Sequence, residues 1–135
     1  MKKHVREKVY NKFNGRCAYC GHEIEYKDMQ VDHVMCKDNF EMYVKNNYKV
    51  PDFLTHLKVD QVNSIDNLFP SCRYCNKRKD TFSLETFRSE LQEQLNRTNK
   101  YCATYRMAKR YGQVQETPEP IMFYFEKVNN LKQNQ

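Results

Sequence analysis

The sequence predicts an α+β fold in which metal-binding cysteines hold two short strands and several helices together. Two segments with strand character, 28–34 and 67–71, are separated by a long stretch of weak periodicity. Two other segments, 4–13 and 84–95, show the apolar spacing of amphipathic helices. One Cys-x-x-Cys pair precedes the first strand and another follows the second. At 135 residues the chain fits a single domain, 1–135.

The N-terminal half of the chain forms most of the predicted core, which extends over about residues 4–80. Apolar residues recur every four positions from Val5 to Phe13 and predict a helix over about 4–13. Alternation of apolar and polar residues over 28–34 predicts the first strand. Residues 35–66 carry scattered aromatic side chains, and we expect an insertion there with one or two short helices.

The C-terminal half is predicted to be mainly helical. After the second strand, residues 75–79 should begin a helix that carries several basic side chains. Beyond it we expect a C-terminal extension over about 82–135. Its predicted elements are a helix over 84–95 with Ser83 as N-cap, a helix over about 100–111 closed by Gly112, and a strand over 121–128.

The net charge of +6 favours a polyanionic partner, of which nucleic acid is the commonest. A basic surface that only improves solubility is the alternative. The charge is segregated, however, because residues 97–113 contain five Lys or Arg and no acid. The N-terminus is charged and lacks the apolar region of a signal peptide, and no segment is long enough to span a membrane. We therefore expect a cytoplasmic location.

The two Cys-x-x-Cys pairs, Cys17 with Cys20 and Cys72 with Cys75, predict one structural zinc site. This spacing lets both sulfurs of a pair reach one ion, and two pairs supply four tetrahedral ligands. A redox motif and an iron–sulfur cluster are weaker alternatives, because their sequence contexts and spacings differ. We expect the remaining thiols, those of Cys36 and Cys102, to be buried small apolar groups.

The residues between and beside these pairs form a recognisable order. Cys-x-x-Cys is followed by Asp-His, Asn-Leu and then Cys-x-x-Cys-Asn-x-x-Lys; the matching positions are Cys17, Cys20, Asp32, His33, Asn67, Leu68, Cys72, Cys75, Asn76 and Lys79. This order resembles the HNH nuclease family across about residues 13–80, and in particular its small stand-alone members from phages and bacteria. The resemblance implies a ββα-metal (His-Me finger) core of two strands and a helix around one catalytic metal ion, stapled by the zinc.

The resemblance also implies roles for individual residues in the hydrolysis of DNA phosphodiester bonds. His33 would be the general base, and Asp32 and Asn76 would bind a catalytic Mg²⁺ or Mn²⁺ ion that is separate from the zinc. Asn67 would brace the loop between the strands and orient His33. The products would carry 5′-phosphate and 3′-hydroxyl ends. Two features depart from the common pattern, namely Asn76 in place of a histidine and the long connection 35–66.

Basic residues near the expected site are candidates for DNA contact. One group flanks the metal ligands, and a second lies in the C-terminal extension; together they are Arg73, Lys77, Arg78, Lys79, Arg106, Lys109 and Arg110. The alternative is a solvated helix face. Tyrosines at 101, 105 and 111 could stack on bases, but their helical spacing favours packing in the core.

The leading hypothesis is therefore a metal-dependent DNA endonuclease. Its main rival is a zinc-stapled DNA-binding or packaging-associated adaptor without catalysis of its own. DNA is the expected partner in both cases, and phage DNA-packaging machinery is a second candidate. We expect a monomer or weak dimer in the cytoplasm of a bacterial or phage-infected cell.

Overall fold

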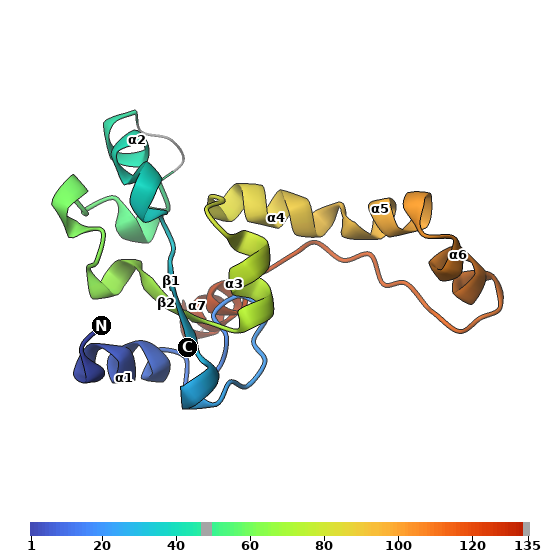
Figure 1. Ribbon diagram of the computed structural model, residues 1–135, viewed down its shortest axis with the longest axis horizontal. Helices are drawn as coiled ribbons and strands as arrows, with labels where there is room; N and C mark the ends of the chain where they lie inside the picture. Colours follow the sequence, from blue (N-terminus) through green and yellow to red (C-terminus); the bar gives the residue numbers. More distant parts are fainter. Residues whose placement is uncertain (47–49, 134–135) are drawn as a thin grey trace.

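The computed structural model of the protein describes residues 1–46 and 50–133 (Figure 1). Within these residues the elements are, in order, α1 (Lys3–Asn11), β1 (Gln30–His33), α2 (Phe40–Lys45), β2 (Leu68–Ser71), α3 (Arg73–Lys79), α4 (Leu84–Gln92), α5 (Gln94–Tyr101), α6 (Ala103–Arg110) and α7 (Tyr124–Gln133). Helices thus surround a small antiparallel sheet, and the predicted α+β class is confirmed.

The two strands form the centre of the molecule. They pair antiparallel, with Asp32 opposite Phe69 and His33 opposite Leu68. All four residues of β2 are buried, whereas Asp32 is the buried residue of β1. A single residue, Cys72, separates β2 from helix α3. Cys72 is the N-cap of α3, and its sulfur accepts a hydrogen bond from the Cys75 amide (3.3 Å). The chain order at the centre is therefore strand, strand, helix.

An aromatic cluster forms much of the core on one side of the sheet. The ring of Tyr19, from the segment before β1, lies 5.4 Å from Phe123 and 5.6 Å from Phe87. Phe69 of β2 lies 4.9 Å from Phe125. Edge-to-face and offset contacts of this kind contribute beyond the burial of their area. The cluster joins the strands to α4 and to the C-terminal segment, which are distant in sequence.

The insertion between the strands contains α2 and several short 3₁₀ turns, as expected for one or two short helices. Its buried side chains include Phe40, Leu54 and Leu57, which belong to the same apolar core. The last 3₁₀ turn (Ile65–Asn67) leads directly into β2. The insertion is therefore packed on the core beside the end of β1.

The predicted C-terminal strand over 121–128 is wrong, because this segment leads into the helix α7. Its alternation is real, since Phe123 and Phe125 are both buried. The backbone N–H groups of Tyr124 and Phe125, however, donate to the carbonyl oxygens of Tyr19 (3.0 Å) and Ala18 (2.9 Å). These bonds satisfy free amides at the start of the helix and dock α7 on the first cysteine pair.

Helices α4, α5 and α6 extend away from the sheet, and α6 lies at the far end of the long axis (Figure 1). The predicted helix over 84–95 continues further, as α4 followed by α5 to Tyr101. A separate helix, α6, replaces the one expected over 100–111, because Cys102 interrupts the helix with extended dihedral angles. Gly112 closes α6 with a φ of 73°, as predicted for a helix C-terminus.

Candidate functional site

The four predicted zinc ligands lie together. The sulfur atoms of Cys17, Cys20, Cys72 and Cys75 are all within 4.8 Å of one another. A zinc–sulfur bond of about 2.3 Å in a tetrahedral site places neighbouring sulfurs about 3.8 Å apart. The sulfurs of Cys20 and Cys72 are separated by 3.8 Å. The cluster therefore fits a zinc ion in both ligand type and spacing.

The thiols of this cluster interact directly with one another. A hydrogen bond with Cys75 lowers the pKa of Cys17 to about 4. Burial raises the pKa of Cys20 to about 11, and the hydrogen bond to Cys17 raises the pKa of Cys75. The sulfurs therefore affect one another's ionisation. A dication supplies the charge that stabilises all four as thiolates.

The first cysteine pair also holds the core together. The Ala18 amide donates to the Pro70 carbonyl of β2 (2.8 Å), and the loop carbonyls receive the first amides of α7. Gly21 has a φ of 79°, and a Cβ there would lie 2.9 Å from the Tyr124 ring. A larger residue at position 21 would therefore strain the turn and push α7 away.

Asp32 lies in a buried polar network at the end of β1. Its Oδ2 atom accepts a hydrogen bond from the Tyr19 hydroxyl and lies 3.0 Å from the Lys79 ammonium nitrogen. Burial raises the pKa of Asp32, and the charge of Lys79 opposes this shift. Among the described residues no buried side-chain nitrogen or oxygen lacks a partner, and Oδ1 has none of these bonds. Oδ1 therefore keeps some contact with solvent.

Lys79 does not have the surface position expected of a DNA contact. Its side chain is fully buried, and its ammonium group donates to the His33 carbonyl (3.0 Å) as well as pairing with Asp32. The prediction that Lys79 contacts a DNA phosphate is therefore wrong, because its side chain is not accessible. The lysine instead joins the last turn of α3 to the end of β1, because both of its partners belong to that strand.

The imidazole of His33 is half-exposed and contacts the insertion. Its Nε2 atom lies 2.8 Å from the Asn63 side-chain oxygen. A carboxamide oxygen has no proton to donate, so this assignment of the amide places the imidazole proton on Nε2 and leaves Nδ1 with a free lone pair. No sequence pattern singled out Asn63, because it lies in a segment without periodicity.

Asn67 is buried and braces the loop that follows β1. Its side-chain oxygen accepts from the Met35 amide (2.8 Å), and its nitrogen donates to the carbonyls of Met35 (3.2 Å) and Val62 (2.9 Å). Its backbone carbonyl accepts from Val34 (2.9 Å). All of these side-chain bonds go to backbone groups, and none goes to the His33 ring. Direct orientation of the ring therefore comes from Asn63, and Asn67 fixes the backbone beside it.

Asn76 lies on α3 one turn before Lys79, and residues three apart share a helix face. The pairing of Lys79 with Asp32 therefore brings this face of α3 to the end of β1. The Asn76 side chain is half-buried and has no hydrogen-bond partner among the described residues. Asp32 and His33 on β1 and Asn76 on α3 thus lie on neighbouring elements, which Lys79 joins.

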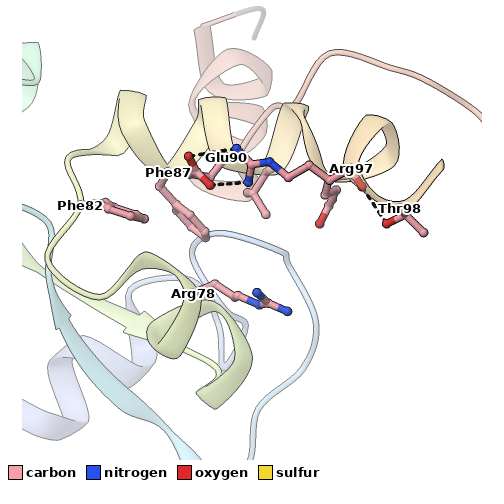
Figure 2. Close-up of a pocket in the computed structure, with 8 residues that line it drawn as sticks. Arg78, Phe82, Phe87, Glu90, Arg97 and Thr98 are labelled. Atoms are coloured by element: carbon pink, nitrogen blue, oxygen red, sulfur yellow. Dashed lines mark hydrogen bonds and ion pairs between the residues drawn. The ribbon is translucent and has the colours of Figure 1, made fainter. Parts of the chain in front are cut away.

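The other basic residues of α3 are exposed. Arg73 packs its guanidinium over the Tyr74 ring at 5.0 Å, and Lys77 is also at the surface. Arg78 lines a groove of about 370 Å³ between α3 and the helices α4 and α5. Figure 2 shows Arg78 reaching beneath these helices, with Phe82 near one end of the groove and Arg97 near the other.

The basic residues of α6 are exposed but partly engaged. Arg106 donates to the carbonyls of Asn99 (2.9 Å) and Lys100 (2.8 Å), and Lys109 pairs with Glu116 at 3.0 Å. Within the described chain, Arg110 forms no ion pair. The expected burial of Cys36 is confirmed, but Cys102 is exposed and its sulfur accepts from the Tyr105 amide (3.4 Å) as the N-cap of α6.

Comparisons with known proteins give one informative match. The chain is 31% identical over 104 residues to the protein named "SPbeta prophage-derived putative HNH endonuclease YoqL" from Bacillus subtilis (strain 168). This match covers 76% of the chain and 36% of the relative, so the chain spans about a third of that protein's length. No protein-family model matches the chain, and no solved structure matches it.

In the described part of the chain, no helix has both the length and the apolar character needed to cross a membrane. The resemblance inferred from the motifs is confirmed by homology. Over 76% of its length this chain is homologous to a protein that bears the HNH endonuclease name.

Proposed function

We propose that the protein is a metal-dependent DNA endonuclease that hydrolyses phosphodiester bonds at the end of the sheet where Asp32, His33 and Asn76 lie. The observation that carries this proposal is the buried Lys79, which fixes α3 against the Asp32-His33 end of β1. The homology to a protein with the HNH endonuclease name supports the same reaction. A zinc-binding module without catalysis would not need Asp32, His33 and Asn76 at the positions of the nuclease motif.

His33 is the proposed general base. The hydrogen bond from its Nε2–H to Asn63 leaves Nδ1 able to accept a proton from a water molecule. A neutral imidazole is suited to this task near neutral pH, because its pKa lies close to that range. Asn63 would hold the ring in one tautomer and one orientation, and Asn67 would keep the backbone around it rigid.

Asp32 and Asn76 would hold the catalytic cation through their oxygen atoms. Oxygen ligands of this kind suit Mg²⁺ or Mn²⁺, and two protein ligands leave positions for water and a phosphate oxygen. When bound, such an ion supplies Lewis-acid polarisation of the scissile phosphate and stabilises the departing 3′ oxygen. The four-cysteine cluster is separate from this site and would remain structural, because sulfur fills its whole coordination shell.

The exposed cations beside the site are the proposed DNA contacts. Arg73, Lys77 and Arg78 are exposed on α3, the helix that also carries the half-buried Asn76. Arg106, Lys109 and Arg110 provide a second basic surface on α6, where Lys109 is partly neutralised by Glu116. Contacts to phosphate position the substrate without specifying its sequence. The cytoplasm of a bacterial or phage-infected cell and a monomer or weak dimer remain the predicted setting.

Cleavage of DNA by the zinc-loaded protein tests the proposal. Plasmid, single-stranded and branched DNA would each be incubated with Mg²⁺ or Mn²⁺, and the ends would be examined for 5′-phosphate and 3′-hydroxyl groups. His33→Ala should abolish cutting, whereas His4→Ala, an exposed histidine of α1, should not affect it. If the wild-type protein cuts none of these substrates but still binds them, the DNA-binding or packaging-associated adaptor becomes the better explanation.

A further inference from the structure

The helices α5 and α6 with their following loop, residues 94–116, form an arm that projects from the body of the molecule (Figure 1). Neither helix has a buried residue, although both are fully described. The arm therefore has no apolar core of its own. Polar interactions must therefore help to hold the arm in shape.

A polar cluster around Glu116 holds the arm together. The carboxylate of Glu116 accepts from the Tyr105 hydroxyl (2.6 Å), the Asn99 amide (2.8 Å) and the Lys109 ammonium group (3.0 Å). Arg106 joins the two helices by donating to the last carbonyls of α5. These contacts connect both helices to the returning loop, so the arm is ordered without burying its large side chains.

Three large side chains of the arm are exposed to solvent. Tyr101 and Tyr111 are each 75% exposed, and Met107 is 48% exposed. This contradicts the expectation that the tyrosines at 101 and 111 pack in the core, whereas Tyr105 is engaged by Glu116. Met107 and Tyr111 are four residues apart and therefore neighbours on one side of the helix. Exposed apolar side chains on an ordered element are therefore candidates for contact with a partner.

The charge around these side chains points to a polyanion. Residues 97–113 contain five basic residues and no acid. Arg97 pairs with Glu90 and Lys109 with Glu116, but Lys100, Arg106 and Arg110 form no ion pair within the described part of the chain. Lys100 lies 5.3 Å from the centre of the Tyr101 ring, and Arg110 directly precedes Tyr111, so cations without an ion pair lie beside both tyrosines. A partner that offers both negative charge and flat apolar faces is a nucleic acid with unpaired bases.

The groove in Figure 2 connects this surface with α3. Arg97 lines the groove and lies one turn before Tyr101 on α5, so both belong to the same side of that helix. Arg78 and the partly exposed ring of Phe82 line the other part of the groove. A single strand that follows this groove would pass from α3 to the arm.

We propose that the arm binds an unpaired segment of DNA, with bases stacked on Tyr101 and Tyr111 and phosphates held by Lys100, Arg106 and Arg110. The proposed substrate is therefore DNA with a single-stranded region next to the cut. The inference rests on the proposed function only in taking DNA as the polyanion. An acidic protein surface is the competing partner and is separated from DNA by the experiment below.

Binding to labelled oligothymidine of about 20 nucleotides, longer than most single-strand sites, tests this inference. The full zinc-loaded chain carries His33→Ala, so that nothing is cut. Tyr101→Ala with Tyr111→Ala should weaken binding about tenfold or more, since stacking contributes strongly for each base. Tyr101→Phe with Tyr111→Phe should retain the affinity. Met122→Ala with Leu131→Ala removes other exposed apolar side chains and should leave it unchanged.

Two further measurements make the result specific. A duplex of equal length should lose much less affinity than the single strand when both tyrosines are replaced. Lys100→Gln with Arg110→Gln should reduce the slope of log affinity against log salt by about 1.4 for two lost phosphate contacts on a single strand. An unchanged single-strand affinity in the alanine variant, or an equal loss for duplex and single strand, would overturn the inference. Either result leaves cleavage by the wild-type protein, and hence the proposed function, unaffected.

Discussion

The ammonium nitrogen of Lys79 lies 3.0 Å from the Asp32 carboxylate, and both side chains are almost completely buried. The pair joins the last turn of α3 to the end of β1, where the neighbouring His33 carbonyl is also bound. Tyr19, from the first cysteine pair, donates to the same carboxylate. One buried network therefore connects the zinc cluster, the strand that carries His33 and the helix that carries Asn76.

Lys79→Met should destabilise the protein strongly. Removal of one partner leaves the buried carboxylate of Asp32 unpaired, and such changes cost roughly 3–5 kcal/mol. The free energy of unfolding, measured with urea on zinc-loaded protein, checks this. Lys77→Met on the same helix is the matched control, because its side chain is exposed and should change stability by less than about 0.5 kcal/mol. Equal stabilities of the two variants would contradict the structural role of Lys79.

Removal of the zinc should unfold the core. The cysteine cluster joins the segment before β1 to the start of α3, and its loop also receives the first amides of α7. We expect one tightly bound zinc per chain by elemental analysis, and loss of the circular-dichroism spectrum when a strong chelator removes it. Cys75→Ser should have the same effect, whereas Cys102→Ser should not, because Cys102 is exposed and distant from the cluster. A folded, metal-free wild-type protein would rule out the staple.

Asn63→Ala should slow DNA cleavage without unfolding the protein. The hydrogen bond from His33 Nε2 to Asn63 is the one that fixes the imidazole, and Asn63 is exposed. Loss of a residue that orients a functional side chain typically costs about 10- to 100-fold in activity. Rates under saturating metal would be compared with those of Asn130→Ala, another exposed asparagine. A rate equal to that of the control would show that Asn63 does not position His33.

Glu116 should titrate at unusually low pH. Hydrogen bonds from Tyr105, Asn99 and Lys109 lower its pKa from 4.5 to about 2. Because the folded pKa is depressed, the stabilisation is fully present above the unfolded pKa of 4.5 and is lost as pH falls toward 2. Carbon-13 NMR of the Glu116 carboxyl group measures this directly. Tyr105→Phe removes the largest cause and should raise the pKa, and an ordinary value in the wild type would contradict the polar cluster of the arm.

The sequence was sufficient for features that depend on local spacing. The two cysteine pairs, the strand at Asp32-His33 and the start of α3 follow from short motifs and alternation, and these are found in the structure close to the predicted bounds. The amphipathic helices α1 and α4 were predicted for the same reason. Each of these features is specified by residues within a few positions of one another.

Features set by distant contacts could not be predicted. The segment after Ile121 alternates like a strand, yet its amides meet carbonyls of the first cysteine pair and a helix begins. Lys79 is one of three consecutive basic residues, and nothing local distinguishes the one that is buried against Asp32. Asn63 became a candidate only when the fold placed it beside His33. In each case the partner lies more than twenty residues away.

The rate of DNA cleavage by His33→Ala under single-turnover conditions tests the central claim most directly. The measurement uses zinc-loaded, folded protein and saturating Mg²⁺ or Mn²⁺. A general base typically contributes about 10²- to 10⁴-fold to the rate. We predict a loss of that size for His33→Ala and none for His4→Ala. Cleavage by His33→Ala at the wild-type rate would contradict the assignment of His33 as the base and, with it, the proposed catalytic site.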